Sequence, residues 1–169
     1  MNNTRSLKPP SLEKKKEDFK KGYLFEAYIK DLFNEKNFKL KRWRKSILLP
    51  PDTYISDLCY PDLELIFVRR NHYPFAVECK YKSNFRVDGT ITWASEKKIA
   101  IYESFEKKFN MTVFIAIGVG GSPSNPQKLF VTPLVNIKDC PNVSEQQLIE
   151  YVRKTDRRFF LDTVNMKLK

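Results

Sequence analysis

The chain has 169 residues, a length that suits one compact domain or one domain with a tail. Hydrophobic residues make up 41% and aromatic residues 14%, so a sizeable core can form although 30% of the residues are charged. The net charge of +11 lies at the two ends, since residues 1–50 carry 14 Lys or Arg against 6 Asp or Glu, and residues 151–169 carry 6 against 2. This distribution suits a polyanion held by basic ends around a more acidic middle, although the same charge also favours solubility.

Cysteine usage and hydropathy exclude several classes of protein. Cys59, Cys79 and Cys140 form no CxxC pair and no zinc-like cluster, so we expect reduced thiols in an intracellular, cytoplasmic protein. The N-terminus lacks the apolar segment of a signal peptide, and no stretch approaches the roughly 18 apolar residues of a membrane span. We therefore expect a soluble protein without a membrane partner.

A helix is predicted to begin at Ser11, which follows two prolines and can cap the first turn. One broad arc of this helix is apolar, at about 100° per residue. Glu26 lies inside that arc, where an unpaired carboxylate would be costly to bury. This position favours a role in a site, and pairing with a lysine at the edge of the arc is the alternative. The apolar members of the arc are Phe19, Tyr23, Phe25, Ile29, Leu32 and Phe33.

Residues 38–46, "FKLKRWRKS", have the character of a strand with basic residues around one tryptophan. Basic groups can contact phosphates, and the tryptophan can stack on a base or pack inward. A solvated strand face is the alternative. Residues 47–61 contain paired prolines and are predicted to form a loop. The candidate nucleic-acid contacts are Lys41, Arg42, Trp43, Arg44 and Lys45.

A β-hairpin is predicted from two segments rich in strand-forming residues, "DLELIFVRR" at 62–70 and "FAVECKYKS" at 75–83. The polar turn "NHYP" joins them, and it contains His72, the only histidine, which we expect on the surface. Residues 84–92 are predicted to form a loop with a turn at Asp88-Gly89.

A second amphipathic helix is predicted at residues 93–110, and Lys98 projects from the middle of its apolar stripe. The next segment, 111–119, is almost uninterruptedly apolar, as expected of a strand covered on both faces. A flexible loop at 120–127 and a strand at 128–134 follow. The apolar stripe consists of Ile99, Ile101, Tyr102, Phe105 and Phe109.

The C-terminal part is predicted to contain a short helix that begins with a Ser-x-x-Gln capping box at Ser144. No element is assigned to residues 157–169. The order of elements predicts an α/β fold, with a mixed central sheet flanked by helices on both faces. We expect one domain, in which a basic extension at residues 1–20 runs into the first helix, residues 21–135 form the core, and residues 136–169 pack on it.

Three ionisable residues of the hairpin carry the functional prediction. Glu78 and Lys80 stand two residues apart on a strand and therefore share a face, and the hairpin folds Asp62 back toward Glu78. Two carboxylates this close repel each other, and a hard divalent cation relieves the repulsion by accepting both as oxygen ligands. Lys80 can then orient or help deprotonate the attacking water, or bind the phosphate. The alternatives are a solvent-facing Glu78–Lys80 pair and an Asp62 that only caps a turn.

These residues resemble a known motif. "PD" at Pro61-Asp62 followed by "ECK" at Glu78-Cys79-Lys80 is similar to the signature of the PD-(D/E)XK nuclease superfamily, which includes restriction endonucleases and archaeal Holliday junction resolvases. The resemblance covers residues 21–134 and implies a restriction-endonuclease-like core. It also implies that Asp62, Glu78 and the backbone carbonyl of Cys79 bind Mg²⁺ or Mn²⁺, and that Lys80 is catalytic.

Two helices extend this resemblance. The first helix of the superfamily often supplies another acidic metal ligand, a place that Glu26 occupies, and the helix after the motif often adds a polar residue, for which Lys98 is the candidate. Fifteen residues separate Asp62 from Glu78, which leaves Asp57 or Glu64 open as the acidic partner. The Cys79 side chain is expected to face away from the site, into the core.

The sequence thus predicts a magnesium-dependent endonuclease that hydrolyses phosphodiester bonds of DNA, with RNA as a substrate and a homodimeric assembly both left open. The alternative is a non-catalytic nucleic-acid-binding protein that keeps a nuclease-like fold. A third hypothesis is that the acidic cluster serves contact with another protein.

Overall fold

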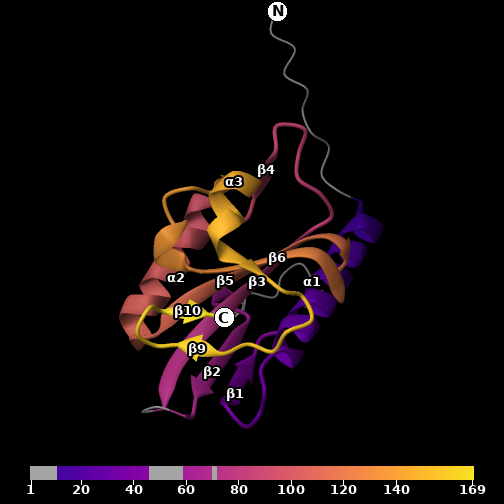
Figure 1. The fold of residues 1–169 in the computed structure, drawn as a ribbon. Helices are drawn as coiled ribbons and strands as arrows, with labels where there is room; N and C mark the ends of the chain where they lie inside the picture. Colours follow the sequence, from indigo (N-terminus) through magenta and orange to yellow (C-terminus); the bar gives the residue numbers. More distant parts are fainter. Residues whose placement is uncertain (1–10, 46–58, 70–71) are drawn as a thin grey trace, which may run out of the picture.

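The computed structural model describes residues 11–45, 59–69 and 72–169. These residues form a mixed six-stranded sheet in the order β1-β2-β3-β5-β6-β8, with helices α1 and α2 on opposite sides (Figure 1). Strands β3 and β5 are parallel, and the other neighbouring strands are antiparallel. The predicted fold class, a mixed central sheet flanked by helices on both faces, is confirmed.

The elements have the following bounds. The six-stranded sheet contains β1 (Phe38–Trp43), β2 (Leu63–Phe67), β3 (Tyr73–Lys82), β5 (Thr112–Ser122), β6 (Asn125–Pro133) and β8 (Val152–Arg153). Two small sheets pair β4 (Thr90–Thr92) with β7 (Asn142–Ser144) and β9 (Leu161–Asp162) with β10 (Lys167–Leu168). The helices are α1 (Leu12–Asp31), α2 (Glu96–Phe109) and α3 (Glu145–Leu148), with short 3₁₀ turns at Leu134–Asn136 and Ile149–Tyr151.

Helix α1 begins as predicted, because the Ser11 hydroxyl accepts a hydrogen bond from the Lys14 amide at 3.3 Å. Its buried face lies very close to β5. A Cβ atom placed on Gly118 would come within 2.4 Å of a ring carbon of Phe25, which is fully buried. Only glycine therefore fits at this crossing. The close approach fixes the height of α1 above the sheet, and with it the position of Glu26, the next residue after Phe25.

The buried arc of α1 is narrower than the predicted one. Phe25 and Ile29 are fully buried, whereas Phe19 and Tyr23 are 40% and 37% exposed. The sequence pattern shows which side chains are apolar, but it does not show which of them another element covers. It therefore could not separate the buried from the exposed group. Glu26, inside the arc, is 2% exposed, as the pattern predicted.

Successive residues of β3 belong to two different cores. Phe75, Val77 and Cys79 pack under α1, whereas Ala76 packs under α2 with Tyr102. This division follows from the alternation of side chains along a strand. Glu78 therefore faces the α2 side, and the Cys79 side chain faces the opposite core, as predicted. All three cysteines are free thiols.

Two loop predictions need correction. Residues 120–127 do not form a flexible loop: β5 and β6 form a tight hairpin, and Gly120 and Gly121 adopt φ angles of +72° and +65° that suit glycine. Residues 90–92 were predicted as loop and form β4, which pairs with β7. The hairpin of β2 and β3, helix α2 and the capping box at Ser144 are confirmed.

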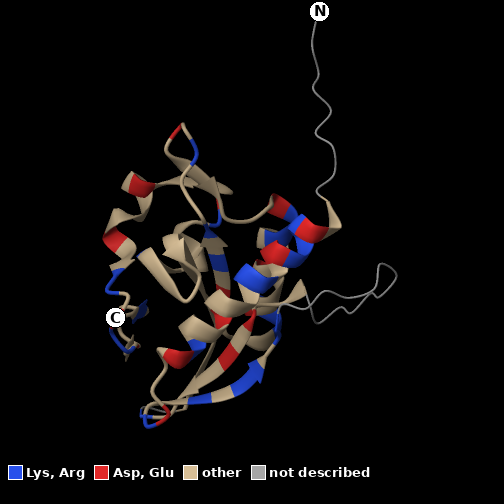
Figure 2. Cartoon of the chain, turned by 90° about the vertical axis from the view of Figure 1, so that its right-hand side faces the viewer, with Lys and Arg blue, Asp and Glu red and all other residues tan. Residues whose placement is uncertain are grey.

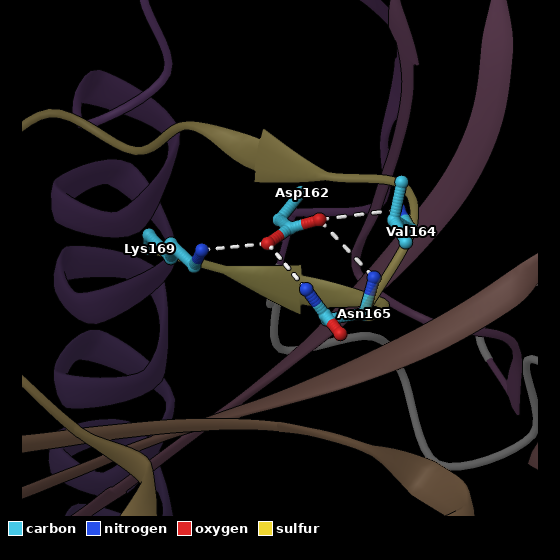
Figure 3. A network of polar contacts seen from close by, with 4 residues as sticks. All are labelled: Asp162, Val164, Asn165 and Lys169. Atoms are coloured by element: carbon cyan, nitrogen blue, oxygen red, sulfur yellow. Dashed lines mark hydrogen bonds and ion pairs between the residues drawn. The ribbon is translucent and has the colours of Figure 1, made fainter.

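The unassigned C-terminal segment forms a β-hairpin that packs on the α1 side of the sheet. Phe159, Leu161 and Leu168 belong to the core under α1. The turn of the hairpin is organised by Asp162, whose carboxylate accepts hydrogen bonds from Val164 and Asn165 and pairs with Lys169 at 2.6 Å (Figure 3). These partners hold the pKa of Asp162 below its usual value.

None of the helices among the described residues is long and apolar enough to cross a membrane.

Candidate active site

The pairing of β2 with β3 brings two carboxylates to one end of the hairpin. Leu63 lies opposite Val77, so the next position outward places Asp62 across from Glu78. The Glu78 charge acts on the Asp62 carboxylate, so the two groups lie near each other at this end of the hairpin.

The Asp62 carboxylate is held at the end of β3 by the backbone. One of its oxygens, Oδ2, accepts a hydrogen bond of 2.7 Å from the amide of Cys79. Burial, and after it the Glu78 carboxylate, raise the pKa of Asp62 well above its usual range, and Lys80 and the Cys79 amide oppose that rise only in part. The Asp62 carboxylate is thus held close to Glu78 in surroundings that disfavour its charge.

Glu78 is almost completely buried, at 2% exposed. Its Oε1 atom forms an ion pair with the Lys80 ammonium. Its Oε2 atom is buried without a hydrogen-bond partner among the described residues. A buried carboxylate oxygen without a partner is costly, so this atom is the one that a bound ligand would satisfy.

Lys80 is kept charged by its two acidic neighbours. Burial alone lowers the pKa of the Lys80 ammonium, but the Glu78 and Asp62 carboxylates together outweigh burial and raise it. Lys80 therefore enters the site as a cation that donates hydrogen bonds. In this state its ammonium can hold an anionic group or orient a water molecule, and it becomes a base only after a change in its surroundings.

Glu26 approaches the site from α1. It is 2% exposed, and its Oε2 atom accepts a hydrogen bond of 2.9 Å from the Trp43 indole nitrogen. Its charge contributes to the raised pKa of Asp62, after burial and Glu78. Glu26, Asp62 and Lys80 line one pocket of about 390 Å³. The structure thus brings Glu26 of the first helix to the same pocket as Asp62 and Lys80, and Glu78 is not among the residues that line it.

The backbone of Cys79 faces this pocket although its side chain does not. In an extended strand, the N–H and C=O of one residue leave the chain on the same side. Because the Cys79 amide donates to Asp62, its carbonyl also points toward Asp62. The buried thiol lies in the opposite core, where burial and the nearby carboxylates raise its pKa.

The arrangement fits a magnesium ion better than a metal held by side chains alone. Among the described residues, no three His, Cys, Asp or Glu side chains are placed so that they could hold a metal ion together. Mg²⁺ does not need such a cage, because it is commonly bound by one or two carboxylates and keeps several of its waters. The unpartnered Oε2 of Glu78, the adjacent Asp62 carboxylate and the Cys79 carbonyl are a donor set of that kind.

Tyr102 is a residue of this site that the sequence analysis assigned only to the core. Its hydroxyl is buried without a hydrogen-bond partner among the described residues, as is Oε2 of Glu78. Tyr102 lies beside Glu78: burial, and after it the charge of Glu78 and a loose hydrogen-bond contact with it, raise the pKa of Tyr102, so its hydroxyl stays protonated and can donate to Glu78. The sequence did offer a signal for this role: Tyr102 places a hydroxyl in the otherwise apolar stripe of α2, one turn after Lys98.

Lys98, unlike Glu26, is not among the residues that line the pocket. Its ammonium lies 5.8 Å from the centre of the Tyr102 ring, and within the described part of the chain no hydrogen bond or ion pair joins it to Asp62 or Glu78. Lys98 reaches the neighbourhood of the site through Tyr102. Its predicted contact with a phosphate or a water molecule stays a prediction.

The basic strand divides into surface and buried members. Lys41, Arg42 and Lys45 are exposed, whereas Arg44 is 9% exposed. Arg44 donates to the Pro61 carbonyl at 2.8 Å and forms an ion pair with Glu64. The prediction that Arg44 contacts nucleic acid is wrong. Its buried guanidinium instead links β1 to the segment that carries Asp62.

The same ion pair bears on the alternative acidic partners. Glu64 is engaged by Arg44, so its carboxylate is neutralised away from the pocket that Asp62 lines. Asp57, the other alternative, lies outside the described residues. His72 is exposed, as predicted, and takes a positive φ of 50°.

Two further lysines line the pocket, together with Asp18. Lys21 of α1 and Lys82 at the end of β3 line it, and neither was chosen from the sequence. Burial, and after it the charges of Lys80 and Arg86, lower the pKa of Lys82. Figure 2 shows Lys and Arg positions gathered on α1 and along the edge strand β1, with acidic positions among them. The surroundings of the carboxylates are therefore suited to an anionic substrate.

Comparisons with known proteins show a weak structural likeness. The chain matches no model of a known protein family and no curated protein. Among solved structures it is similar to a Holliday junction resolvase, Hjc, from the archaeal hyperthermophile Archaeoglobus fulgidus, with 13% identity over 68% of this chain and 80% of that chain and a TM-score of 0.46. The likeness is loose, and the assignment of function rests on this chain's own side chains.

Proposed function

We propose that this protein is a metal-dependent nuclease that hydrolyses phosphodiester bonds of DNA, with Mg²⁺ or Mn²⁺ as its cofactor. The observation that carries the proposal is the Oε2 atom of Glu78, which is buried without a partner beside a second carboxylate and a charged lysine. A buried carboxylate oxygen without a partner is costly, and a bound cation would satisfy it.

Each residue has a defined task in this proposal. Asp62, Glu78 and the Cys79 carbonyl would hold the ion, and Glu26 would complete the acidic side of the pocket. When bound, the ion would stabilise the negative charge that develops on the phosphate and acidify water in contact with it. Lys80 would hold a phosphate oxygen or orient the attacking water, because it is a cation beside the carboxylates.

The substrate assignment follows from charge. Exposed basic residues on β1 and around the pocket suit a polyanion, and a phosphodiester is the bond that a two-carboxylate site with a lysine can hydrolyse. We take DNA as the substrate class and RNA as the comparison in the test.

The test is cleavage of plasmid, linear duplex, single-stranded and branched DNA and of RNA by the purified chain, with Mg²⁺, Mn²⁺ or EDTA. We expect cleavage only with metal. Glu78→Gln and Lys80→Met should each lower the rate by about 10²-fold or more, the usual range for losing a group that acts on the reacting atoms. Glu145→Gln, which removes an acid from a half-exposed surface ion pair with Lys128, is the matched control.

Two results would contradict the proposal. One is wild-type inactivity on every nucleic acid with either metal, which would favour the non-catalytic binding protein. The other is equal activity of the wild type and Glu78→Gln, which would assign any cleavage to a contaminant. Thermal unfolding in EDTA shows whether each variant is folded before its activity is compared.

A further inference from the structure

Helix α1 carries two aromatic side chains on its outer surface. Phe19 and Tyr23 are 40% and 37% exposed, and their spacing of four residues places them on the same face. A lysine lies one turn before each of them, Lys16 before Phe19 and Lys20 before Tyr23, and both lysines are exposed. Exposed aromatics that repeat along a basic face indicate a binding surface, unlike single exposed apolar residues.

Tyr23 does not stand alone on this surface. Its ring is stacked on the ring of Trp43, with centroids 5.4 Å apart and an angle of 13° between the planes. The Trp43 indole is itself held by its hydrogen bond to Glu26. Two cations flank it, with the Lys45 and Lys30 ammonium groups 4.8 Å and 5.6 Å from its ring centre. The stack is thus oriented in advance and surrounded by positive charge.

These features restrict what can bind here. An apolar peptide would cover the rings but would offer no partner to the ammonium groups of Lys16, Lys20 and Lys45. A DNA duplex would satisfy the lysines, but its bases are stacked on one another and present no free face. A single strand satisfies both, because its phosphates pair with lysines and its unpaired bases stack on aromatic rings.

We propose that the Phe19–Tyr23 face of α1 binds unpaired nucleobases, so that the nucleic acid taken by the candidate site is single-stranded or has unpaired nucleotides next to the cut. Trp43 supports the platform rather than receiving the base, because Tyr23 already occupies one of its faces and Lys45 lies over the ring. The hydrogen bond from Trp43 to Glu26 joins this platform to the acidic pocket. The inference rests on the proposed function in taking the bound strand to be the one that is cut.

The experiment measures binding separately from cleavage. Fluorescence anisotropy in EDTA compares a labelled single-stranded oligonucleotide with the blunt duplex of the same sequence, for the full chain and its variants. We expect Tyr23→Ala to weaken single-strand binding by about 5- to 150-fold, the range for loss of one base–aromatic stack, and to change duplex binding by less than about twofold. Tyr23→Phe should bind like the wild type, since it keeps the ring.

The matched control is Phe109→Ala, which removes an aromatic side chain of the same 40% exposure from the end of α2. It should leave single-strand binding unchanged. A single strand carrying 2-aminopurine adds a direct readout, because emission of this base is quenched when it stacks on a ring. We expect quenching with the wild type and Tyr23→Phe, and none with the double variant Phe19→Ala/Tyr23→Ala.

Equal affinity for single strand and duplex, with no effect of Tyr23→Ala on either, would overturn the inference. So would a change in oligomeric state of Tyr23→Ala without nucleic acid, which would make this face a protein interface. If binding is as expected but no substrate is cleaved, the proposed function fails while the binding surface stands. If cleavage occurs without any effect of Tyr23→Ala, the inference fails and the proposed function stands.

Discussion

The Asp62 carboxylate accepts the amide hydrogen of Cys79 at 2.7 Å, one position beyond the point where β2 ends its pairing with β3. The Asp62 side chain thus accepts a hydrogen bond that a backbone carbonyl of β2 would accept if the strand pairing continued. Asp62 is thus locked by the backbone next to Glu78, and the repulsion between the two carboxylates cannot be relieved by a simple rotation of its side chain. A cost of this kind is typical of functional sites and makes measurable predictions about the metal-free protein.

We predict that Asp62→Asn stabilises the protein in EDTA at neutral pH. The asparagine oxygen can still accept the Cys79 amide, while the charge beside Glu78 is removed. The expected gain is about 1–3 kcal/mol in the free energy of unfolding, which thermal or urea unfolding measures. Mg²⁺ should stabilise the wild type and not the variant. A loss of stability in Asp62→Asn would show that the charge is compensated.

The same comparison has a definite pH dependence. The folded-state pKa of Asp62 is raised, so protonation favours the folded protein: this contribution is fully present below the unfolded pKa and is lost as pH rises through the folded pKa. The advantage of Asp62→Asn should therefore be largest above the folded pKa and should shrink as pH falls. An advantage that grew toward acid pH would contradict the assignment.

Tyr102→Phe is expected to leave the unfolding free energy in EDTA within about 1 kcal/mol of the wild type, or to increase it, because the removed hydroxyl has no hydrogen-bond partner among the described residues. Cleavage should fall all the same if this hydroxyl helps to position Glu78 or a water molecule. Urea unfolding and initial cleavage rates separate the two effects. A loss well above 2 kcal/mol would reveal a structural hydrogen bond instead.

Gly118→Ala should be destabilising by about 1–3 kcal/mol, since the new Cβ would lie 2.4 Å from the Phe25 ring and would push α1 away from the sheet. Because α1 carries Glu26, cleavage should also fall. The double variant Gly118→Ala/Phe25→Leu should recover part of the stability by making room. If Gly118→Ala alone unfolds like the wild type, α1 does not lie as close to β5 as described.

Alanine variants of two basic residues on β1 should affect different properties, with Lys41 contributing to nucleic-acid binding and Arg44 to stability. Lys41→Ala, on the exposed face of β1, should weaken nucleic-acid binding, lower the salt dependence by about one phosphate contact, and leave stability unchanged. Arg44→Ala breaks a buried ion pair and should cost about 3–5 kcal/mol of stability. Salt-dependent anisotropy and urea unfolding measure the two effects. The reverse pattern would return Arg44 to the candidate contacts.

Local sequence patterns were sufficient to predict several elements. The Ser11 cap, the hairpin that carries Glu78, the uninterrupted apolar strand and the capping box at Ser144 were all predicted and found. Each depends on interactions within a few residues or on burial of a whole strand, so the pattern is contained in the segment itself. The grouping of Asp62, Glu78 and Lys80 followed from strand alternation in the same way.

Long-range contacts decided the rest. The pattern that placed Phe19 and Tyr23 with Phe25 could not show that the first two remain exposed, because exposure depends on which elements lie over the helix. Likewise, the sequence could not distinguish Arg44 from the exposed basic residues of β1, because its partners Glu64 and Pro61 are distant in the chain. The alternation of side chains along a strand is enough to show which ionisable groups share a face. Whether those groups are buried, paired or left without a partner depends on neighbours from other elements, which the local pattern does not contain.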